Sequence, residues 1–492
     1  MKEEHILALD LGTTGNRAIV FDKEQNIISK SYKEFTQIYP KPGWVEHDPE
    51  EIWRSACSVI KEAIEKVGIG SIKAIGITNQ RETVVMWDKK TGKPIHNAIV
   101  WQDRRTALLC KDMKDEGMED AIHNKTGLFL DPYFSATKIK WLLDNVEGLR
   151  EKAESGLVLC GTIDTWLLWK LTLGKVHATD YSNASRTMLF NLKLLDWDKG
   201  LCELFGVPMN ILPRIMESSG LFGYTDKSLF CREIPITGVT GDQQAAMFAQ
   251  GCFEPGIVKN TYGTGLFLLM NTQDKMYLSN NLITTVAWKI KGEVDYAVEG
   301  SVFIGGAAVQ WLRDGLRLFK DASETEAISN SVNSTEGVYF VPALVGLGAP
   351  YWDANARGMI TGITRGTKSA HIVRAALEAI CYQTRDVLEV MVNELNIKLK
   401  RLQADGGACQ NNFIMQFQAD ILGILVERPK VIETTALGVA GMAGLAVGLW
   451  GSKEEFLSMR QIDREFHSNM AEEDREIYYS GWKNAIKKSL SK

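Results

Sequence analysis

The chain has 492 residues, 45% of them hydrophobic and 24% charged, which is the balance of a folded protein too long for one ordinary core. Its formal net charge of −5 is spread along the sequence without a basic stripe, which argues against nucleic acid or an anionic membrane as partner and favours a small molecule. No CxxC spacing relates the eight cysteines. The N-terminus enters a predicted strand without a signal peptide, and the apolar stretch Ala436–Trp450 is too short to cross a bilayer. We therefore expect reduced thiols, a cytoplasmic location and no membrane insertion.

Strands and helices alternate in the first half of the chain. A strand at Ile6–Leu9 enters a tight turn, and a second strand leaves it. Apolar periodicity and β-branched runs predict the later elements. The predicted strands are Arg17–Phe21, Ile72–Thr78, a hairpin of Val84–Trp87 with Ala98–Trp101, and Ile236–Val239; the predicted helices are Pro49–Val67, Arg104–Asp115, Ser135–Asn145, Thr162–Leu171 and Gln243–Ala249.

The second half repeats this style of alternation. Its predicted strands are Gly256–Asn260, Leu266–Asn271, Leu282–Lys289, Asp295–Glu299 and Leu402–Ala404, and its predicted helices are Gly306–Leu318, Ser369–Asn393, Asn412–Leu422 and Ala436–Val447. Mixed strands and helices indicate an α/β fold. The segment Gln250–Pro255 favours a boundary between an N-terminal domain, residues 1–251, and a C-terminal domain, residues 252–492, closely apposed around a cleft.

Three glycine-containing turns follow predicted strands. They are Asp10–Thr14, Thr261–Gly265 and Asp405–Gly407. Such a turn can direct backbone N–H groups and hydroxyls at a phosphate, although a single one is more often a plain hairpin. A Walker A motif and a GxGxxG fingerprint are absent from the sequence. Three turns in this order indicate a nucleotide held between two lobes.

Asp242 stands where the strand Ile236–Val239 meets the start of a helix. A carboxylate there can accept a proton from an alcohol that attacks a γ-phosphate, with Gln243 holding the hydroxyl. Helix capping is the alternative role for Asp242.

Arg81 and Glu82 also follow a strand, at the edge where an open α/β sheet binds its ligand. One donates hydrogen bonds and the other accepts them, which suits a polyol, although adjacent charges are usually a solvated pair. Trp101 and Tyr133 are read as aromatic walls, with a place in the core as the alternative.

Together these residues resemble the FGGY family of carbohydrate kinases, which has the fold of actin, hexokinase and the heat-shock ATPases. Both family signatures can be read, the first at Tyr133–Asn145 and the second at Gly358–Ile363 with His371–Glu378. Segments Pro42–Asp48, Asn79–Glu82, Trp101–Arg105 and Gly241–Gln244 are typical of members that act on glycerol. The likeness implies two actin-like, ribonuclease H-like ATPase domains around a central cleft.

The resemblance implies phosphorylation of glycerol to sn-glycerol 3-phosphate by ATP with Mg²⁺, in a homodimer or homotetramer. Asp242 would be the catalytic base and Asp10 would direct the metal, largely through water. The remaining implied contacts are Arg81, Glu82, Trp101, Tyr133, Gln243 and Phe267 for glycerol, and Thr13, Thr14, Gly15, Arg17, Thr264, Gly306, Gln310, Gly407 and Asn411 for the nucleotide.

Two segments depart from the family pattern. Gly15-Asn16 stands where polar pairs are common, so one phosphate contact is expected from backbone alone. Residues Leu221–Glu233 lack a Gly-Gly-Thr-Arg loop and a histidine, so regulation by fructose 1,6-bisphosphate or by a phosphotransferase is not expected. The alternatives are an FGGY kinase for another polyol or a pentulose, and a non-catalytic actin-like ATP-binding protein.

Overall fold

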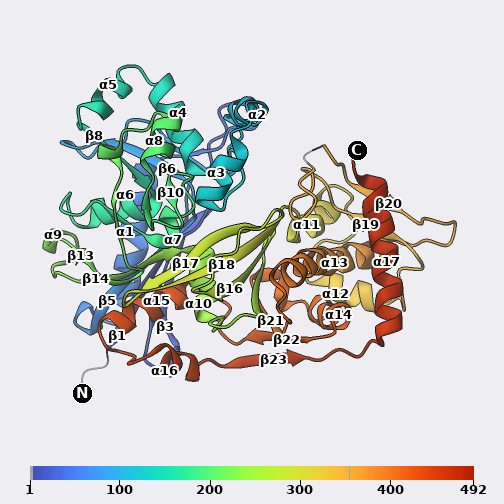
Figure 1. The fold of residues 1–492 in the computed structure, drawn as a ribbon. Coiled ribbons are helices and arrows are strands. Elements are labelled where there is room, and N and C mark those ends of the chain that lie inside the picture. Colours follow the sequence, from blue (N-terminus) through green and yellow to red (C-terminus); the bar gives the residue numbers. More distant parts are fainter. Residues whose placement is uncertain (1–3, 354, 492) are drawn as a thin grey trace.

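One long sheet runs through both halves of the chain in this computed structural model, which describes residues 4–353 and 355–491 (Figure 1). Its 13 strands lie in the order β3-β2-β1-β5-β14-β13-β17-β18-β16-β15-β21-β22-β23. The first half supplies β1 (His5–Leu11), β2 (Gly15–Phe21), β3 (Ile27–Glu34), β5 (Ile72–Asn79), β13 (Ser219–Tyr224) and β14 (Pro235–Gly241). The second half supplies β15 (Ile257–Tyr262), β16 (Leu266–Gln273), β17 (Ile283–Ile290), β18 (Glu293–Val302), β21 (Arg401–Asp405), β22 (Leu425–Pro429) and β23 (Ile462–Phe466).

The two halves of the sheet repeat one pairing pattern. In the first, β3, β2 and β1 are antiparallel, and β5 and β14 continue parallel to β1. In the second, β18, β16 and β15 are antiparallel, and β21 and β22 continue parallel to β15. The β1–β2 and β15–β16 turns therefore occupy equivalent places, beside the carboxyl ends of parallel strands. The halves meet where β13 pairs with β17 at Ser219 and Ile290.

Helices cover the outer face of each half-sheet. In the first half, α1 (Pro49–Glu65) and α6 (Ile163–Leu171) share an apolar core with β1, β5 and β14. In the second, α13 (Ser369–Leu395) and α14 (Asn412–Leu422) pack against β15, β16 and β21, and α17 (Glu472–Ser489) lies outside them.

Two helices lie crosswise between the half-sheets. Helix α15 (Thr434–Ala446) belongs to the second half but packs on β14, β5 and β1, whereas α10 (Asp242–Ala249) belongs to the first half and reaches β15 and β16. The helices approach so closely that a Cβ on Gly438 would lie 1.8 Å from the carbonyl oxygen of Ala245. A separate apolar core joins these two helices to both halves of the sheet, so the halves of the chain interlock.

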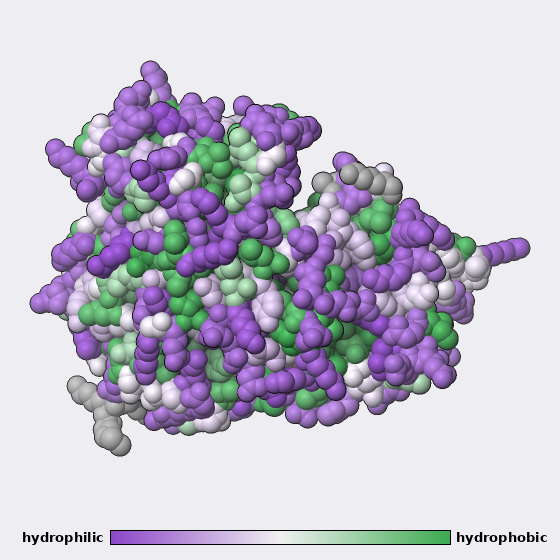
Figure 2. Space-filling model, in the orientation of Figure 1, coloured by the Kyte–Doolittle hydropathy of each residue, from purple (hydrophilic) through white to green (hydrophobic). Residues whose placement is uncertain are grey.

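The first half also carries a smaller lobe, upper left in Figure 1, built on a four-stranded sheet. Figure 2 shows the surface indented between this lobe and the lobe at the right. The small lobe contains β4 (Glu46–His47), β6 (Val84–Asp88), β7 (Ala98–Ile99), β8 (Val158–Thr162), β10 (Phe190–Asn191), β11 (Asp196–Trp197), α2 (Ala107–Asp115), α3 (Glu119–Thr126), α4 (Ser135–Asn145), α5 (Leu149–Glu154) and α8 (Lys199–Phe205). The other elements are β9 (Ala178–Asp180), β12 (Arg214–Met216), β19 (Tyr339–Val341), β20 (Met359–Thr361), α7 (Tyr181–Ala184), α9 (Lys227–Phe230), α11 (Gly306–Asp314), α12 (Glu324–Asn330) and α16 (Lys453–Ser458).

The α/β prediction is confirmed, with differences at element ends. The helix predicted to reach Leu318 ends at Asp314, because Gly315 follows as its C-cap. The strand predicted for Ala98–Trp101 pairs only over Ala98–Ile99, and the helix predicted from Arg104 begins at Ala107. Across the described residues, every helix is too short or too polar to span a bilayer.

Candidate active site

The β1–β2 turn and the equivalent β15–β16 turn each present threonine hydroxyls at the surface of the protein. The Gly12 N–H donates to the Gly15 carbonyl at 3.1 Å, and the Gly263 N–H donates to the Gly265 carbonyl at 3.0 Å. Thr14 and Thr264 are exposed, and Thr13 is half-buried. A Cβ on Gly15 would lie 2.7 Å from the Lys33 carbonyl oxygen, which explains why a larger residue does not stand there.

Backbone hydrogen bonds fasten the start of α11 to the second turn. The N–H groups of Gly305 and Ala307 donate to the Thr264 carbonyl, and that of Gly306 donates to the Gly263 carbonyl. Gly306 therefore lies beside Thr264, and Gln310 is exposed one turn further along α11. This brings three of the predicted nucleotide contacts together.

The third glycine turn, at the end of β21, leaves open space. A Cβ on Gly407 would meet nothing within 4 Å. Asn411 caps α14, since its Oδ1 accepts from the Ile414 N–H at 3.2 Å and its Nδ2 donates to Thr325 Oγ1 at 3.1 Å. Both ends of the Asn411 amide are thus engaged within the protein.

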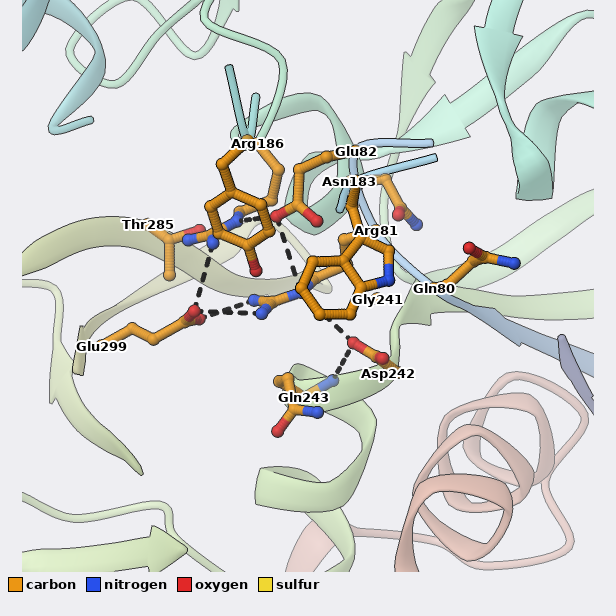
Figure 3. A network of polar contacts seen from close by, with 12 residues as sticks. Gln80, Arg81, Glu82, Asn183, Arg186, Gly241, Asp242, Gln243, Thr285 and Glu299 are labelled. Atoms are coloured by element: carbon orange, nitrogen blue, oxygen red, sulfur yellow. Dashed lines mark hydrogen bonds and ion pairs between the residues drawn. The ribbon is translucent and has the colours of Figure 1, made fainter. Parts of the chain in front are cut away.

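The carboxyl ends of β5 and β14 bring Arg81, Glu82 and Asp242 together (Figure 3). Arg81 Nε lies 3.2 Å from Asp242 Oδ1. Asp242 begins α10 and accepts from the adjacent Gln243 N–H, whereas Gly241 occupies the N-cap position, so the capping alternative is wrong. The side chain of Asp242 is 28% exposed, against 2% for Arg81 and 1% for Glu82. The Arg81–Glu82 pair is therefore buried rather than solvated, and only Asp242 opens outward.

Partial enclosure changes the proton affinity of Asp242. Burial raises its pKa above the ordinary aspartate value, and the positive charge of Arg81 opposes that rise. A raised pKa makes a carboxylate a stronger base. Asp242 combines this property with an open face.

Two buried charges that the sequence analysis missed complete the cluster. Glu299, on β18, accepts from Arg81 Nη1 at 2.6 Å and from Arg81 Nη2 at 3.0 Å. Arg186 donates through Nε to Glu82 at 2.6 Å and through Nη2 to Glu299 at 3.1 Å (Figure 3). Burial would raise the pKa of Glu299, but Arg186 and Arg81 together lower it to about 2. For Glu299 the available signal was a charged residue within Tyr296–Val302, the buried part of β18, whose other side chains are uncharged.

Lys259, on β15, was also missed, and it sets the orientation of Gln243. Its Nζ donates to Gln243 Oε1 and, at 3.3 Å, to the Phe267 carbonyl. With that oxygen engaged, the Gln243 side chain offers its amide hydrogens to a ligand.

Three aromatic rings stand close to one another edge to face. The ring of Trp101 lies 5.6 Å from that of Tyr133 and 6.3 Å from that of Phe267, between centroids. Trp101 Nε1 also donates to Thr13 Oγ1 at 3.0 Å, which connects the aromatic wall to the first turn. All three rings are half-buried, so they are available as ligand contacts.

Asp10 lies at the end of β1, in reach of one arginine. Arg17 Nη1 is 3.5 Å from Asp10 Oδ2 and 2.7 Å from Glu433 Oε2. Burial raises the pKa of Asp10 to about 7, which a bound cation would lower. No group of three or more His, Cys, Asp and Glu residues forms a metal cage within residues 4–353 and 355–491. A single carboxylate suits Mg²⁺ that keeps most of its waters and binds phosphate oxygens.

Known proteins match the chain over its full length. The N-terminal domain of the FGGY family of carbohydrate kinases matches residues 5–249, and its C-terminal domain matches residues 258–447. Glycerol kinase 2 of Thermotoga maritima and glycerol kinase of Caldanaerobacter subterraneus are each 61% identical over 490 residues, 99% of both chains. The crystal structure of Plasmodium falciparum glycerol kinase with ADP superposes with a TM-score of 0.94 at 39% identity, covering 100% of this chain and 99% of that one. The chain belongs to the FGGY family of carbohydrate kinases.

Proposed function

We propose that the protein transfers the γ-phosphoryl group of ATP to a terminal hydroxyl of glycerol, giving sn-glycerol 3-phosphate and ADP. The observation that carries this proposal is the half-open Asp242 beside Arg81, with Lys259 linking the adjacent Gln243 to the backbone of Phe267 in the aromatic wall. The 61% identity to two glycerol kinases over 99% of their length supports glycerol as the acceptor.

Asp242 acts as the general base. Its carboxylate takes the proton of the attacking hydroxyl as the oxygen bonds to phosphorus, and ADP leaves on the opposite side. Arg81 and Gln243 donate hydrogen bonds to the hydroxyls, Glu82 accepts one, and Tyr133 contributes its phenol. Trp101 and Phe267 pack on the carbon chain, and these bulky rings favour a three-carbon acceptor over a pentulose.

The nucleotide lies between the two equivalent turns. Thr13, Thr14, Gly15 and Arg17 contact its phosphates from one half, and Thr264 does so from the other. Gly306, Gln310, Gly407 and Asn411 frame the nucleoside, with Asn411 acting by holding the start of α14 in place. Asp10 holds Mg²⁺, which neutralises phosphate charge when bound.

The family resemblance supports a proposal for the oligomeric state of the protein and for its location in the cell. We propose a homodimer or homotetramer in the cytoplasm, to be tested by sedimentation of the purified protein.

The substrate is tested by coupling ADP release to a panel of polyols and ketoses. Glycerol should give the highest kcat/KM, and the product should be sn-glycerol 3-phosphate. Faster turnover of xylulose would overturn the choice of acceptor, and absence of ADP release with every compound would overturn the assignment as a kinase.

A further inference from the structure

Three of the five hydrogen-bond donors of Arg81 are engaged within the protein. A guanidinium has five N–H groups. Two of them point at the two oxygens of Glu299, and a third donates to Gln244 Oε1 at 3.2 Å. Two remain, one on Nε, the atom that lies 3.2 Å from Asp242. Because the paired contacts to Glu299 fix the guanidinium plane, they also fix where these remaining donors point.

Glu299 reaches further residues of the substrate site through Arg186. Both side chains are wholly buried. Arg186 lies 3.1 Å from Glu299, holds Glu82 at 2.6 Å, and places its guanidinium 5.5 Å from the centre of the Tyr133 ring. Arg81, Glu82 and Tyr133 therefore all rest on one pair of buried charges, as Figure 3 shows for the first two.

This pair of charges joins the two halves of the chain. Arg81 and Arg186 come from the first half, whereas Glu299 lies on β18, 218 residues after Arg81. Strand β18 ends at Val302, just before the N–H groups of residues 305–307 that hold the Thr264 turn. Strand β18 thus carries Glu299 beside the proposed polyol contacts and leads directly to the turn that is proposed to bind the nucleotide.

Packing alone does not account for these charges. A buried ion pair is often no more stabilising than apolar residues of the same volume, because both ions lose their hydration. The geometry that the pair imposes is its distinctive property, since an apolar replacement could not fix the plane of Arg81.

We propose that Glu299 is a positioning residue for the phosphoryl acceptor, acting through Arg81 and, by way of Arg186, through Glu82. The second half of the chain thereby sets the geometry of polyol contacts that the first half supplies. This inference rests on the proposed function in one respect, namely that Arg81 and Glu82 bind the acceptor.

Glu299→Gln tests the proposal, because glutamine keeps the shape but loses the charge and one acceptor. Hydrogen bonds to charged groups contribute about 1.5–3 kcal/mol, so KM for the polyol should rise roughly 10- to 100-fold. KM for ATP should stay within about twofold, since no direct contact to the nucleotide is removed. Glu299→Asp keeps the charge but is one methylene shorter, so it should also raise KM for the polyol.

The matched control is Glu293→Gln, an exposed position on the same strand. It should leave both KM values unchanged. Nucleotide binding and the unfolding temperature of each variant show whether it is folded, and Glu299→Asp carries the test if Glu299→Gln does not fold. An unchanged polyol KM, an equal rise in KM for ATP, or full recovery in Glu299→Asp would overturn the positioning role.

The wild-type protein in the same experiment separates this inference from the proposed function. If it does not phosphorylate glycerol, the choice of substrate is wrong. The effect of Glu299 is then measured with the polyol that the panel selects, by turnover or by the rise it causes in unfolding temperature. A selective loss for that polyol would still support the positioning role, and no loss would refute it.

Discussion

Asp242 is the most exposed member of a cluster of buried charges. Arg81, Glu82, Arg186 and Glu299 are almost wholly enclosed, and each is paired inside the protein. Asp242 forms an ion pair with Arg81 and has a face open to a ligand. We expect this difference in exposure to separate the proposed base from the residues proposed to hold the substrate.

Asp242→Asn should lower kcat at least about 100-fold, because a general base contributes about 10²–10⁴-fold. The binding of glycerol should change little, since the amide keeps the size of the side chain. Steady-state kinetics and calorimetric binding measure the two effects. Asp120→Asn, at an exposed position on α3, serves as the control. A kcat within threefold of the wild type would remove Asp242 from the role of base.

We expect the buried side chain of His47 to make the stability of the protein depend on pH. Its Nε2 lies 2.9 Å from Gln37 Oε1 and its Nδ1 faces the amide of Gln80, and burial lowers its pKa to about 4. Between about pH 6.5 and 4 the unfolded chain binds a proton that the folded protein does not bind, so stability falls as the pH falls. One such histidine contributes roughly 3 kcal/mol across this window.

His47→Gln should therefore reduce the slope of unfolding free energy against pH between 4 and 6.5, measured by denaturant titration. His177, whose pKa is also lowered to about 4, contributes its own part of the pH dependence in the wild type and in the variant. His467→Gln, which alters a side chain that is 71% exposed, should leave the slope unchanged. Equal slopes in the wild type and His47→Gln would contradict this assignment.

The sequence pointed to candidate site residues but not to their buried partners. Asp10 lies at the end of a strand, and Asp242 and the glycine turns lie at or just after strand ends, so local pattern was enough to propose them. Glu299 and Arg186 bind residues 218 and 104 positions away, and such pairing depends on how the sheets assemble. The roles of all these site residues stay predictions, and that of Gln310 rests on the family resemblance alone.

At the scale of elements, the crossed helices α10 and α15 determine how the half-sheets meet. The helix predicted at Ala436–Val447 is confirmed as α15, and its small residues allow close packing. The sequence could not show that this helix lies on the sheet of the other half, because its apolar residues fit any flat apolar face. The crossing is a property of the whole assembly.

Gly438→Ala should destabilise the protein, since its Cβ would overlap the Ala245 carbonyl unless α10 and α15 move apart. Overpacking of this kind costs about 1–3 kcal/mol. The midpoint of denaturant unfolding measures the effect. Gly220→Ala, where a Cβ meets nothing within 4 Å, is the matched control. Equal midpoints for both variants would show that the helices separate without cost.

At the scale of the molecule, the predicted division at residue 251 cuts through an interlocked structure. A fragment of residues 1–251 lacks α15, which covers β14, β5 and β1 in the full chain. The fragment should bind anilinonaphthalene sulfonate and aggregate, because that apolar face is left bare. Adding residues 252–492 should reverse both effects, as measured by fluorescence and gel filtration. A soluble fragment that does not bind the dye would instead mark the first 251 residues as an autonomous domain.

The crossed position of α15 also matters during synthesis of the chain. The strands that it covers are complete at Gly241, whereas the helix begins at Thr434. At about 5–20 residues per second, a ribosome takes roughly 10–40 s to make the intervening segment. For that time the nascent first half carries an uncovered apolar sheet, and this interval is when a chaperone has an apolar surface to bind.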